Sequence, residues 1–305
     1  PPPLPPPPPA AGQARAPLRA AGLHAADSIG ERGAPVPMRF VSGLIKPKHG
    51  IPGFDYAGVV DKVGGGVTEV REGDAVFGEC AGSCAEFVCA KPEKLAPKPE
   101  DLSFVEAAAV PTSALAALHA LRDVAKLEAG QRVLINGASG GVGSFAVQIA
   151  KHLGAMVSGV CGPKNIDLVR SLGAVVVIDY TKEDFAQRVA EFDTIFDNVE
   201  NRALSACRRA LKKDGTLILN SGTGARGLSL LVRIIKPLLL SPFTRQKLRR
   251  YLSEPNREDL QWLAARIDNR ELRPVIDRVY TLDEVPAALA YIEAGHARGK
   301  VVVEM

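Results

Sequence analysis

Hydrophobic positions form two different patterns along this chain. Between about Val59 and Val88, short apolar runs are separated by Gly and Asp, as in GVV, KVGGGVTEV, REGDAVFG and AEFV. Short strands with turn residues this close together predict a compact antiparallel barrel. Ser103 and Glu106 then have the spacing of a capping box, so we expect a helix through AAAV and another helix after Pro111.

From Gln131 onward, apolar strands alternate with amphipathic helices. Strands are predicted at RVLI, VSGV, VVVI, TIFDNV and TLIL, and a helix is predicted after each of the first four. This alternation predicts parallel βαβ units with both sheet faces covered, so the fold class is α/β with a doubly wound sheet. A final run, VVV from Val301, follows the helix-like stretch EVPAALAYIEAG, and we expect it to rejoin the first domain.

The stretch NGASGGVG lies between the predicted strand VLI and the predicted helix SFAVQIAKHLG. Gly137, Gly140 and Gly143 have the spacing G-x-x-G-x-x-G, with an extra glycine at Gly141. Without side chains at this turn, a pyrophosphate can approach bare N–H groups at the positive end of the helix. Glycines also serve plain tight turns, but the position inside a βαβ series predicts a dinucleotide site.

The end of the second strand of that series selects the dinucleotide. An Asp or Glu there would bind the ribose 2′-hydroxyl of NAD, whereas this strand ends VSGVCGPKN and carries no carboxylate. Cys161 and Gly162 leave room, and Lys164 offers a positive charge to a 2′-phosphate. The sequence therefore predicts NADPH in preference to NADH, and the alternative is that Lys164 is a solvated lysine at a helix start.

Composition excludes several classes of protein. The chain has 305 residues, a formal net charge of +4 and no dense basic tract interleaved with aromatic residues, so nucleic acid is not an expected partner. Five unevenly spaced cysteines indicate a reducing compartment, which predicts a cytoplasmic protein or one of an organellar stroma or matrix, not a secreted one.

The apolar run from Leu228 and the proline-rich start of the chain are two further segments with predicted roles. The apolar run from Leu228 is broken by Arg233, Lys236 and Pro237, so it is too short to span a membrane and is predicted to be buried or dimer-facing. A peripheral contact with a membrane surface is the alternative for this run. Eight of the first nine residues are proline, which predicts an extended, disordered tail over residues 1–19.

Several motifs together resemble those of the medium-chain dehydrogenase/reductase superfamily, and more narrowly its zinc-independent branch of quinone oxidoreductases and enoyl reductases. The motifs are INGASGGVGSFAVQIAKHLGA, GFDYAGVV, REGDAVFG, EAAAVP, FDNV and GHARGKVVV. The resemblance implies a GroES-like β-rich catalytic domain over residues 20–115 and 273–305 and a Rossmann NADP-binding domain over residues 116–272. It also implies a homodimer.

The resemblance carries over a set of coenzyme contacts. The elbow amides of Ala138 to Gly143 are expected to hold the pyrophosphate, with Cys161, Lys164 and Tyr180 near the adenosine end. Asn198 and Gly222 are expected near the nicotinamide, and Lys300 resembles a family lysine close to the coenzyme. The alternative for Lys300 is an exposed lysine that opens an edge strand. The whole expected set is Gly137, Ala138, Ser139, Gly140, Gly141, Val142, Gly143, Cys161, Lys164, Tyr180, Asn198, Gly222 and Lys300.

No metal site is predicted. Zinc-dependent relatives bind zinc through the His of a G-H-E segment, and the matching segment here is Gly53-Phe54-Asp55, whose phenyl ring cannot bind a metal. Cys80, Cys84 and Cys89 lack the paired spacing of a structural zinc site and are expected to be small apolar fillers.

The expected reaction is hydride transfer from NADPH to a quinone or to the activated C=C of an α,β-unsaturated carbonyl, because a conjugated acceptor delocalises charge without a metal. His24, Asp27 and Tyr56 are the candidate catalytic residues. Tyr56 is a candidate proton donor, with aromatic packing inside the barrel as its alternative. His24 is a candidate hydrogen-bond partner of ribose or substrate, with a structural loop histidine as its alternative.

Two positions depart from the family pattern. Glu200 stands where relatives have the glycine of DNVG, and Ala116 stands where they commonly have a threonine. In a third departure, the proline tract is expected to replace the first strands of the catalytic domain. Together these departures motivate a second hypothesis, an NADPH-binding protein without turnover. A zinc-type alcohol dehydrogenase is the least favoured enzyme.

Overall fold

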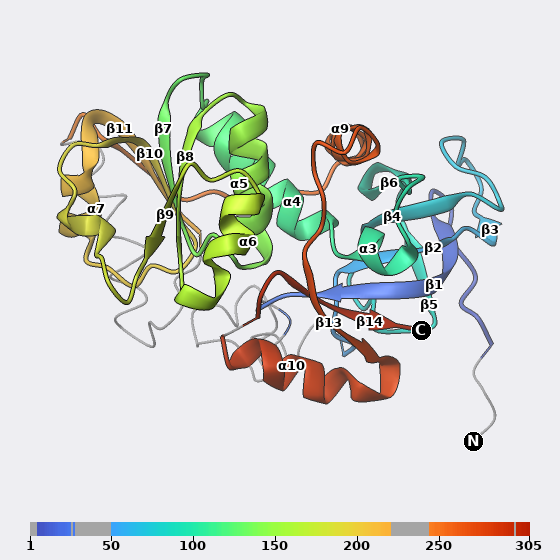
Figure 1. The fold of residues 1–305 in the computed structure, drawn as a ribbon. Helices are drawn as coiled ribbons and strands as arrows, with labels where there is room; N and C mark the ends of the chain where they lie inside the picture. Colours follow the sequence, from blue (N-terminus) through green and yellow to red (C-terminus); the bar gives the residue numbers. More distant parts are fainter. Residues whose placement is uncertain (1–4, 26, 28–49, 221–243, 296) are drawn as a thin grey trace. The chain divides into compact units, whose positions relative to one another are not determined.

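The computed structural model describes residues 5–25, 27, 50–220, 244–295 and 297–305. Its contacts divide the chain into two compact units, both drawn in Figure 1. One unit contains Pro1–Leu115 together with Glu254–Met305, and the other contains Ala116–Ser253. The first boundary coincides with the predicted one, whereas the second lies 19 residues earlier than the predicted boundary at 272/273.

The described part of the first unit forms an eight-stranded sheet. Strands β13, β14, β1, β2, β4 and β6 are neighbours in that order, and β3 and β5 also pair with β1. Their bounds are Ala14–Leu23 for β1, Asp55–Val59 for β2, Lys62–Val63 for β3, Ala75–Glu79 for β4, Phe87–Ala90 for β5, Leu95–Pro97 for β6, Ile276–Thr281 for β13 and Lys300–Glu304 for β14. This is the β-rich, barrel-like unit that the short apolar runs predicted.

Strand β1 is the inner strand on which this unit is built. Its alternate residues Ala14, Ala16 and Leu18 are buried in a hydrophobic cluster with residues of β2, β4, β5 and β6. Burial of this face explains why residues 14–19 are strand, not part of the disordered tail that was predicted, and that expectation is corrected here. Leu23 at the end of β1 lies opposite Val301 of β14, which confirms that the C-terminal run rejoins this unit.

Helices cover the sheet and close the unit. Helix α3, Phe104–Ala108, begins at the predicted capping box, in which Ser103 and Glu106 each accept a hydrogen bond from the other's amide. Helix α10, Val285–Glu293, packs its buried side chains against β14 and the end of β1. Two 3₁₀ turns, η1 at Pro92–Lys94 and η6 at Leu282–Glu284, precede β6 and α10.

Helix α9, Arg257–Asp268, explains why the second boundary differs from the predicted one. It packs against β6, and the Arg257 guanidinium donates hydrogen bonds to the carbonyls of Leu95, at 3.1 Å, and Glu69, at 3.0 Å. Those contacts join residues 254–272 to the first unit, whereas the sequence analysis placed them in the Rossmann domain.

The predicted helix after Pro111 is present as α4, Pro111–Leu118, and continues as the π-helical segment η2, His119–Val124.

The second unit then contains a six-stranded sheet in its described residues. Its bounds are Arg132–Asn136 for β7, Met156–Cys161 for β8, Val176–Asp179 for β9, Phe192–Asp197 for β10, Leu211–Leu219 for β11 and Lys247–Arg249 for β12.

The order of these strands is β12-β11-β10-β7-β8-β9, and every neighbouring pair is parallel. The chain therefore winds outward in one direction from β7 to β9 and in the other from β10 to β12. This is the doubly wound order of a Rossmann domain, and its direction reverses between β7 and β10. The α/β prediction for this unit is confirmed.

The helices of the second unit follow the predicted positions with one exception. They are α5 at Gly141–His152, α6 at Ile166–Ser171 and α7 at Leu204–Ala210, with a 3₁₀ turn η3 at Pro163–Asn165. Between β9 and β10 the predicted helix is wrong, because the chain forms only the 3₁₀ turn η4, Phe185–Gln187. Phe185 is buried in the core cluster, and Arg188 after it is extended and paired with Glu183 and Glu191.

Among the described residues, no helix combines the length and apolar character needed to cross a membrane. The apolar run from Leu228 and the residue Gly222 lie outside the described residues.

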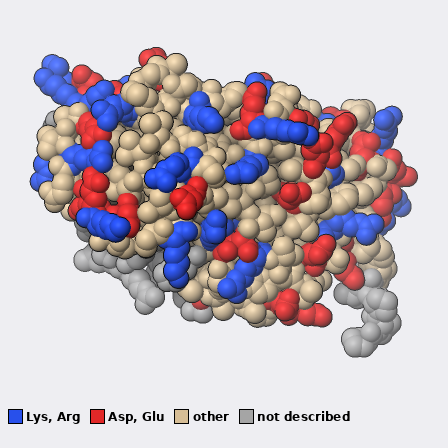
Figure 2. All heavy atoms as spheres, in the orientation of Figure 1, with Lys and Arg blue, Asp and Glu red and all other residues tan. Residues whose placement is uncertain are grey.

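On the face drawn in Figure 2, Lys and Arg are interspersed with Asp and Glu and do not gather over one element.

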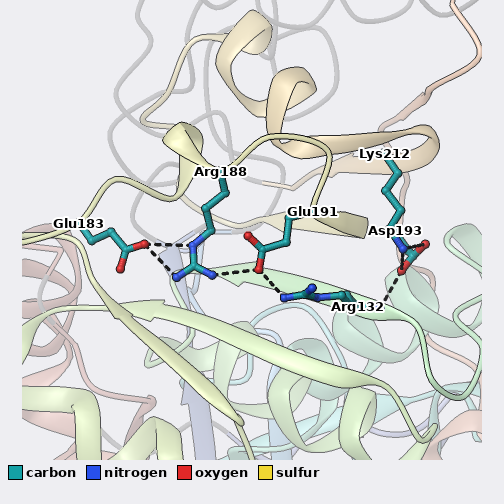
Figure 3. A network of polar contacts seen from close by, with 6 residues as sticks. All are labelled: Arg132, Glu183, Arg188, Glu191, Asp193 and Lys212. Atoms are coloured by element: carbon teal, nitrogen blue, oxygen red, sulfur yellow. Dashed lines mark hydrogen bonds and ion pairs between the residues drawn. The ribbon is translucent and has the colours of Figure 1, made fainter.

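A network of ion pairs lies at the amino ends of β7, β10 and β11 (Figure 3). Asp193 accepts a hydrogen bond from the Arg132 amide and two from the Lys212 ammonium, each at 2.9 Å. Glu191 contacts the guanidinium groups of both Arg132 and Arg188. Although burial acts to raise the pKa of Asp193, the Arg132 amide and the Lys212 ammonium hold that pKa below its usual range.

We expect Asp193→Asn to lower the free energy of unfolding by about 1 kcal/mol at pH 7, because the carboxylate is only partly buried. A carboxyl whose folded pKa is depressed stabilises above its unfolded pKa, and this stability is lost as pH falls through the folded value. The difference between wild type and variant should therefore shrink below about pH 4 in urea unfolding measured over a pH series. Asp167→Asn, which removes an exposed carboxylate 3.4 Å from Arg170, is the matched control. Equal destabilisation by Asp193→Asn at all pH values would contradict this account.

Candidate functional site

The glycine elbow connects the carboxyl end of β7 to the amino end of α5 by a tight turn in which Gly137 and Gly143 cannot be replaced without strain. Gly137 has a φ of +79°, a conformation that favours glycine. A Cβ on Gly143 would lie 2.0 Å from the Gly137 carbonyl oxygen, which is backbone and cannot move aside. Gly140 is the N-cap of α5, and a Cβ there would meet only the same oxygen at 3.5 Å. Glycine at Gly143 is therefore required by packing.

The amides of the elbow divide into two groups. The Ala138 amide donates to the Val160 carbonyl at 2.9 Å, and the Gly140 amide donates to the Gly137 carbonyl at 3.1 Å. These two amides are committed to the fold, so the expectation that all the amides from Ala138 to Gly143 can hold a pyrophosphate is corrected.

The amides of Gly141 to Gly143 belong to the first turn of α5, where N–H groups have no acceptor within the helix. None of them has a backbone acceptor elsewhere in the described residues. The positive end of the helix dipole adds to their attraction for an anion. The absence of a Cβ at Gly143 and these open N–H groups fit a bound phosphate group.

The predicted adenosine-end residues gather at the carboxyl ends of β8 and β9. Cys161 is the buried last residue of β8, and burial together with the Asp179 carboxylate raises the pKa of its thiol to about 11. Lys164 is exposed in the turn η3. Tyr180 is 53% exposed, and its hydroxyl would lie 3.1 Å from a Cβ on Gly162.

Sequence reasoning missed Asp179 at this end of the sheet. It considered only the second strand, whereas the register places Asp179 of β9 opposite Cys161 of β8. Its Oδ1 accepts hydrogen bonds from the amide and hydroxyl of Thr181, which hold the pKa of Asp179 below its usual range. The run VVVIDY, a predicted strand ending in a carboxylate, was the available signal.

The turn after β10 contains the predicted residue Asn198. Its amide and side-chain nitrogen donate to the Asn136 carbonyl at 3.2 and 3.3 Å, and its Oδ1 accepts from Asn220 at 2.9 Å. Asp197 beside it is buried and accepts a hydrogen bond from the Asn136 side chain at 2.7 Å. Burial raises the pKa of Asp197. Asn136 and Asp197 were not predicted, although both stand at the ends of predicted strands.

In the first unit, Lys300 belongs to a buried polar cluster. Its side chain is 2% exposed, and its ammonium lies 2.9 Å from the Asp55 carboxylate. The alternative of an exposed lysine on an edge strand is wrong, because β14 lies between β13 and β1. Asp55 also accepts hydrogen bonds from the amide and hydroxyl of Thr112.

Glu79 completes this cluster and was also missed by the sequence analysis. It lies opposite Asp55 in the register of β2 and β4, so two carboxylates face one ammonium. Burial, together with the Asp55 charge, raises the pKa of Glu79 to about 8. A carboxyl with a raised pKa therefore lies beside the Asp55–Lys300 pair. Nothing in the spacing of these residues along the chain indicated the cluster.

His24 and Asp27 lie close together, as the sequence analysis required of a shared site. His24 Nδ1 is 3.5 Å from Asp27 Oδ2, and the imidazole stacks on the Phe54 ring with centroids 5.5 Å apart. Asp27 is held by the amides of His24, at 2.8 Å, and Gly53, at 3.0 Å. Burial raises the pKa of Asp27 and the His24 charge opposes this rise. His24 Nε2 has no hydrogen-bond partner among the described residues.

Tyr56 does not join this site. It is fully buried in the barrel cluster with residues such as Val60, Val76 and Leu95. Burial raises the pKa of its hydroxyl, which has no hydrogen-bond partner in the described structure. The candidate role as proton donor is corrected: Tyr56 packs inside the barrel, which was its alternative.

Of the three cysteines expected to be apolar fillers, Cys84 is buried, whereas Cys80 and Cys89 are only partly buried. Cys84 is buried in the cluster under α10, Cys80 packs against the barrel cluster, and burial raises the pKa of Cys80 and Cys89. In the described residues no three His, Cys, Asp or Glu side chains are grouped so that they could hold a metal ion.

Comparison with known proteins shows the family. Residues 11–102 match the alcohol dehydrogenase GroES-like domain, and residues 172–303 match the model described as zinc-binding dehydrogenase. The chain is 32% identical over 289 residues to a chloroplast envelope quinone oxidoreductase homolog of Arabidopsis thaliana, covering 88% of this chain and 86% of the relative. The chain belongs to the medium-chain dehydrogenase/reductase superfamily.

Two further proteins are similar over most of this chain. The NADPH-dependent alkenal/one oxidoreductase of Arabidopsis thaliana chloroplasts is 32% identical over 273 residues, and this chain spans 64% of its length. The solved quinone oxidoreductase of Coxiella burnetii is 30% identical with a TM-score of 0.85, covering 99% of this chain and 93% of that structure. These similarities support both the GroES-like and the Rossmann assignments.

We expect Gly143→Ala to destabilise the second unit by about 3 kcal/mol, because the added methyl group overlaps the Gly137 carbonyl. Gly140→Ala is the matched control, since its methyl group fits and only the N-cap preference is lost, at about 1 kcal/mol. Thermal unfolding followed by circular dichroism compares the two variants. Equal stability of the two variants would show that the elbow has more room than this geometry allows.

Proposed function

We propose that this chain is an NADPH-dependent, zinc-independent oxidoreductase that reduces a quinone or the activated C=C of an α,β-unsaturated carbonyl. The glycine elbow carries the proposal. It combines three open amides at a helix amino terminus with a glycine, Gly143, that cannot carry a side chain. The named activities of the similar Arabidopsis and Coxiella proteins support the substrate class.

The second unit is proposed to bind the coenzyme. The amides of Gly141 to Gly143 would hold the pyrophosphate, and the exposed Lys164 would pair with the 2′-phosphate, with Tyr180 and Cys161 beside it. Asn198 and Gly222 are proposed to approach the nicotinamide, since ligands of doubly wound sheets bind at the carboxyl ends of the strands. Bound NADPH would supply the hydride.

His24 and Asp27 are the proposed groups for hydrogen bonding and proton transfer to the acceptor. Asp27 orients the imidazole through Nδ1, which leaves Nε2 to donate or accept a proton. Lys300 is assigned to the buried pair with Asp55, so it acts on the coenzyme only if that pair opens. Because Phe54 stands where a zinc ligand would be needed, a conjugated acceptor is proposed over a simple ketone or alcohol.

The second hypothesis, an NADPH-binding protein without turnover, rested partly on the negative charge of Glu200. That carboxylate forms an ion pair with Arg250, so its charge is compensated within the second unit. This contact removes the charge-repulsion argument for the binding-only alternative. The proposed location remains the cytoplasm or an organellar stroma or matrix.

We expect purified protein to oxidise NADPH when quinones or enones are added, with no effect of chelators, in an assay that follows the loss of reduced-nicotinamide absorbance. Lys164→Gln should raise the KM for NADPH about tenfold and leave that for NADH nearly unchanged, because only NADPH carries the 2′-phosphate. Lys182→Gln, an exposed lysine of the same region, is the control.

Three results would contradict the proposal. Fluorescence changes on adding NADPH without oxidation across a broad acceptor panel would establish the binding-only alternative. Stoichiometric zinc with activity on alcohols would favour a zinc-type alcohol dehydrogenase. An equal effect of Lys164→Gln on both coenzymes would exclude its role at the 2′-phosphate.

We also propose that the chain forms a homodimer, as the family resemblance implies. Sedimentation equilibrium should then give twice the chain mass of 32.3 kDa. A mass of one chain across micromolar concentrations would overturn this proposal.

A further inference from the structure

Glu200 occupies a backbone conformation that normally selects glycine. Its φ is +54°, in the left-handed region, and its residue surface is only 4% exposed. A side chain in this region costs on the order of 1 kcal/mol, so surrounding contacts must hold it there. A carboxylate this deeply buried also needs a partner.

The partner is Arg250, which follows the edge strand β12. Its two terminal nitrogens contact the two carboxylate oxygens of Glu200 at 3.0 and 2.6 Å, in the bidentate geometry that strengthens such pairs. The same guanidinium lies 3.4 Å from the Leu219 carbonyl at the end of β11. The pair therefore ties the turn after β10 to the ends of β11 and β12.

The turn that carries Glu200 also packs on the glycine elbow. Val199 Cγ2 lies 2.8 Å from the position that a Cβ on Gly137 would occupy, so Val199 fills the space beside the first elbow glycine. Asp197 accepts hydrogen bonds from the amides of Val199, at 3.1 Å, and Glu200, at 2.8 Å, and from the Asn136 side chain. Displacement of Glu200 would therefore be transmitted to Gly137 through one residue.

We propose that Glu200 and Arg250 are positioning residues for the coenzyme: their ion pair holds residues 197–200 against the elbow and compensates the charge of a buried carboxylate in that turn. This inference rests on the proposed binding of NADPH at the elbow. Arg250 acts through Glu200, so its contribution depends on the presence of Glu200.

Removal of Arg250 alone has two consequences for the coenzyme. It removes the bidentate guanidinium from a buried carboxylate in the turn after β10, at the carboxyl edge of the sheet where the phosphate groups would bind. It also releases the strained turn that supports Gly137. Removal of both side chains, with glycine at 200, eliminates the charge and relieves the backbone strain together.

The test is a fluorescence titration with NADPH of wild type, Arg250→Met, Glu200→Gly and the double variant. Arg250→Met should raise the Kd for NADPH by at least about tenfold, and the double variant should bind within about threefold of wild type. Lys247→Met, which removes an exposed charge from strand β12, is the control and should leave the Kd unchanged.

A purely structural pair would lower the melting temperature of Arg250→Met without changing the Kd, and that result overturns the inference. Failure of the double variant to recover affinity also overturns it. If Arg250→Met does not fold, Arg250→Lys, which keeps the charge and loses the bidentate contact, should weaken binding about threefold. An unchanged Kd for Arg250→Lys would count against the pair. If wild-type protein itself binds no NADPH, the proposed function fails, and the two failures are thereby distinguished.

Discussion

The close approach of strand β7 and helix α5 is the constraint on which the second unit depends. The Gly137 carbonyl occupies the place where any side chain on Gly143 would begin, so strand, turn and helix fit only with glycine there. The approach leaves the first amides of α5 at the carboxyl edge of the sheet, beside the reversal of strand order between β7 and β10. One packing requirement thus creates both the turn and a set of open amides of the kind that suits an anion.

Two buried ion pairs, one in each unit, form the second theme of the structure. Asp55 and Lys300 neutralise each other in the first unit, while Glu79 next to them carries a raised pKa. Glu200 and Arg250 do the same in the second unit. Because an isolated buried charge is costly, these partners are fixed by energetics as much as by shape.

The first unit shows how segments distant in sequence become one sheet. Strand β1 pairs with the C-terminal strand β14 on one side and with β2 on the other, and its buried face fills the barrel.

Cap, strand and helix signals are local, and they were predicted correctly at Ser103, in the strands after Gln131 and in the final VVV run. The helix before β10 was predicted wrongly because burial of Phe185 and the Arg188 ion pairs outweigh local propensity.

The sequence by itself determined the features that depend on periodicity or on a local constraint of a residue's backbone or chemistry. The alternation of strands and helices, the glycine elbow and the missing zinc-ligand histidine belong to this group. Tertiary structure alone decided which polar groups meet. It buried Tyr56, paired Lys300 with Asp55 across 245 positions, placed Asp179 beside Cys161 and gave Glu200 its partner 50 residues away. Such pairings depend on strand register and on desolvation, and neither is encoded in the spacing of residues along the chain.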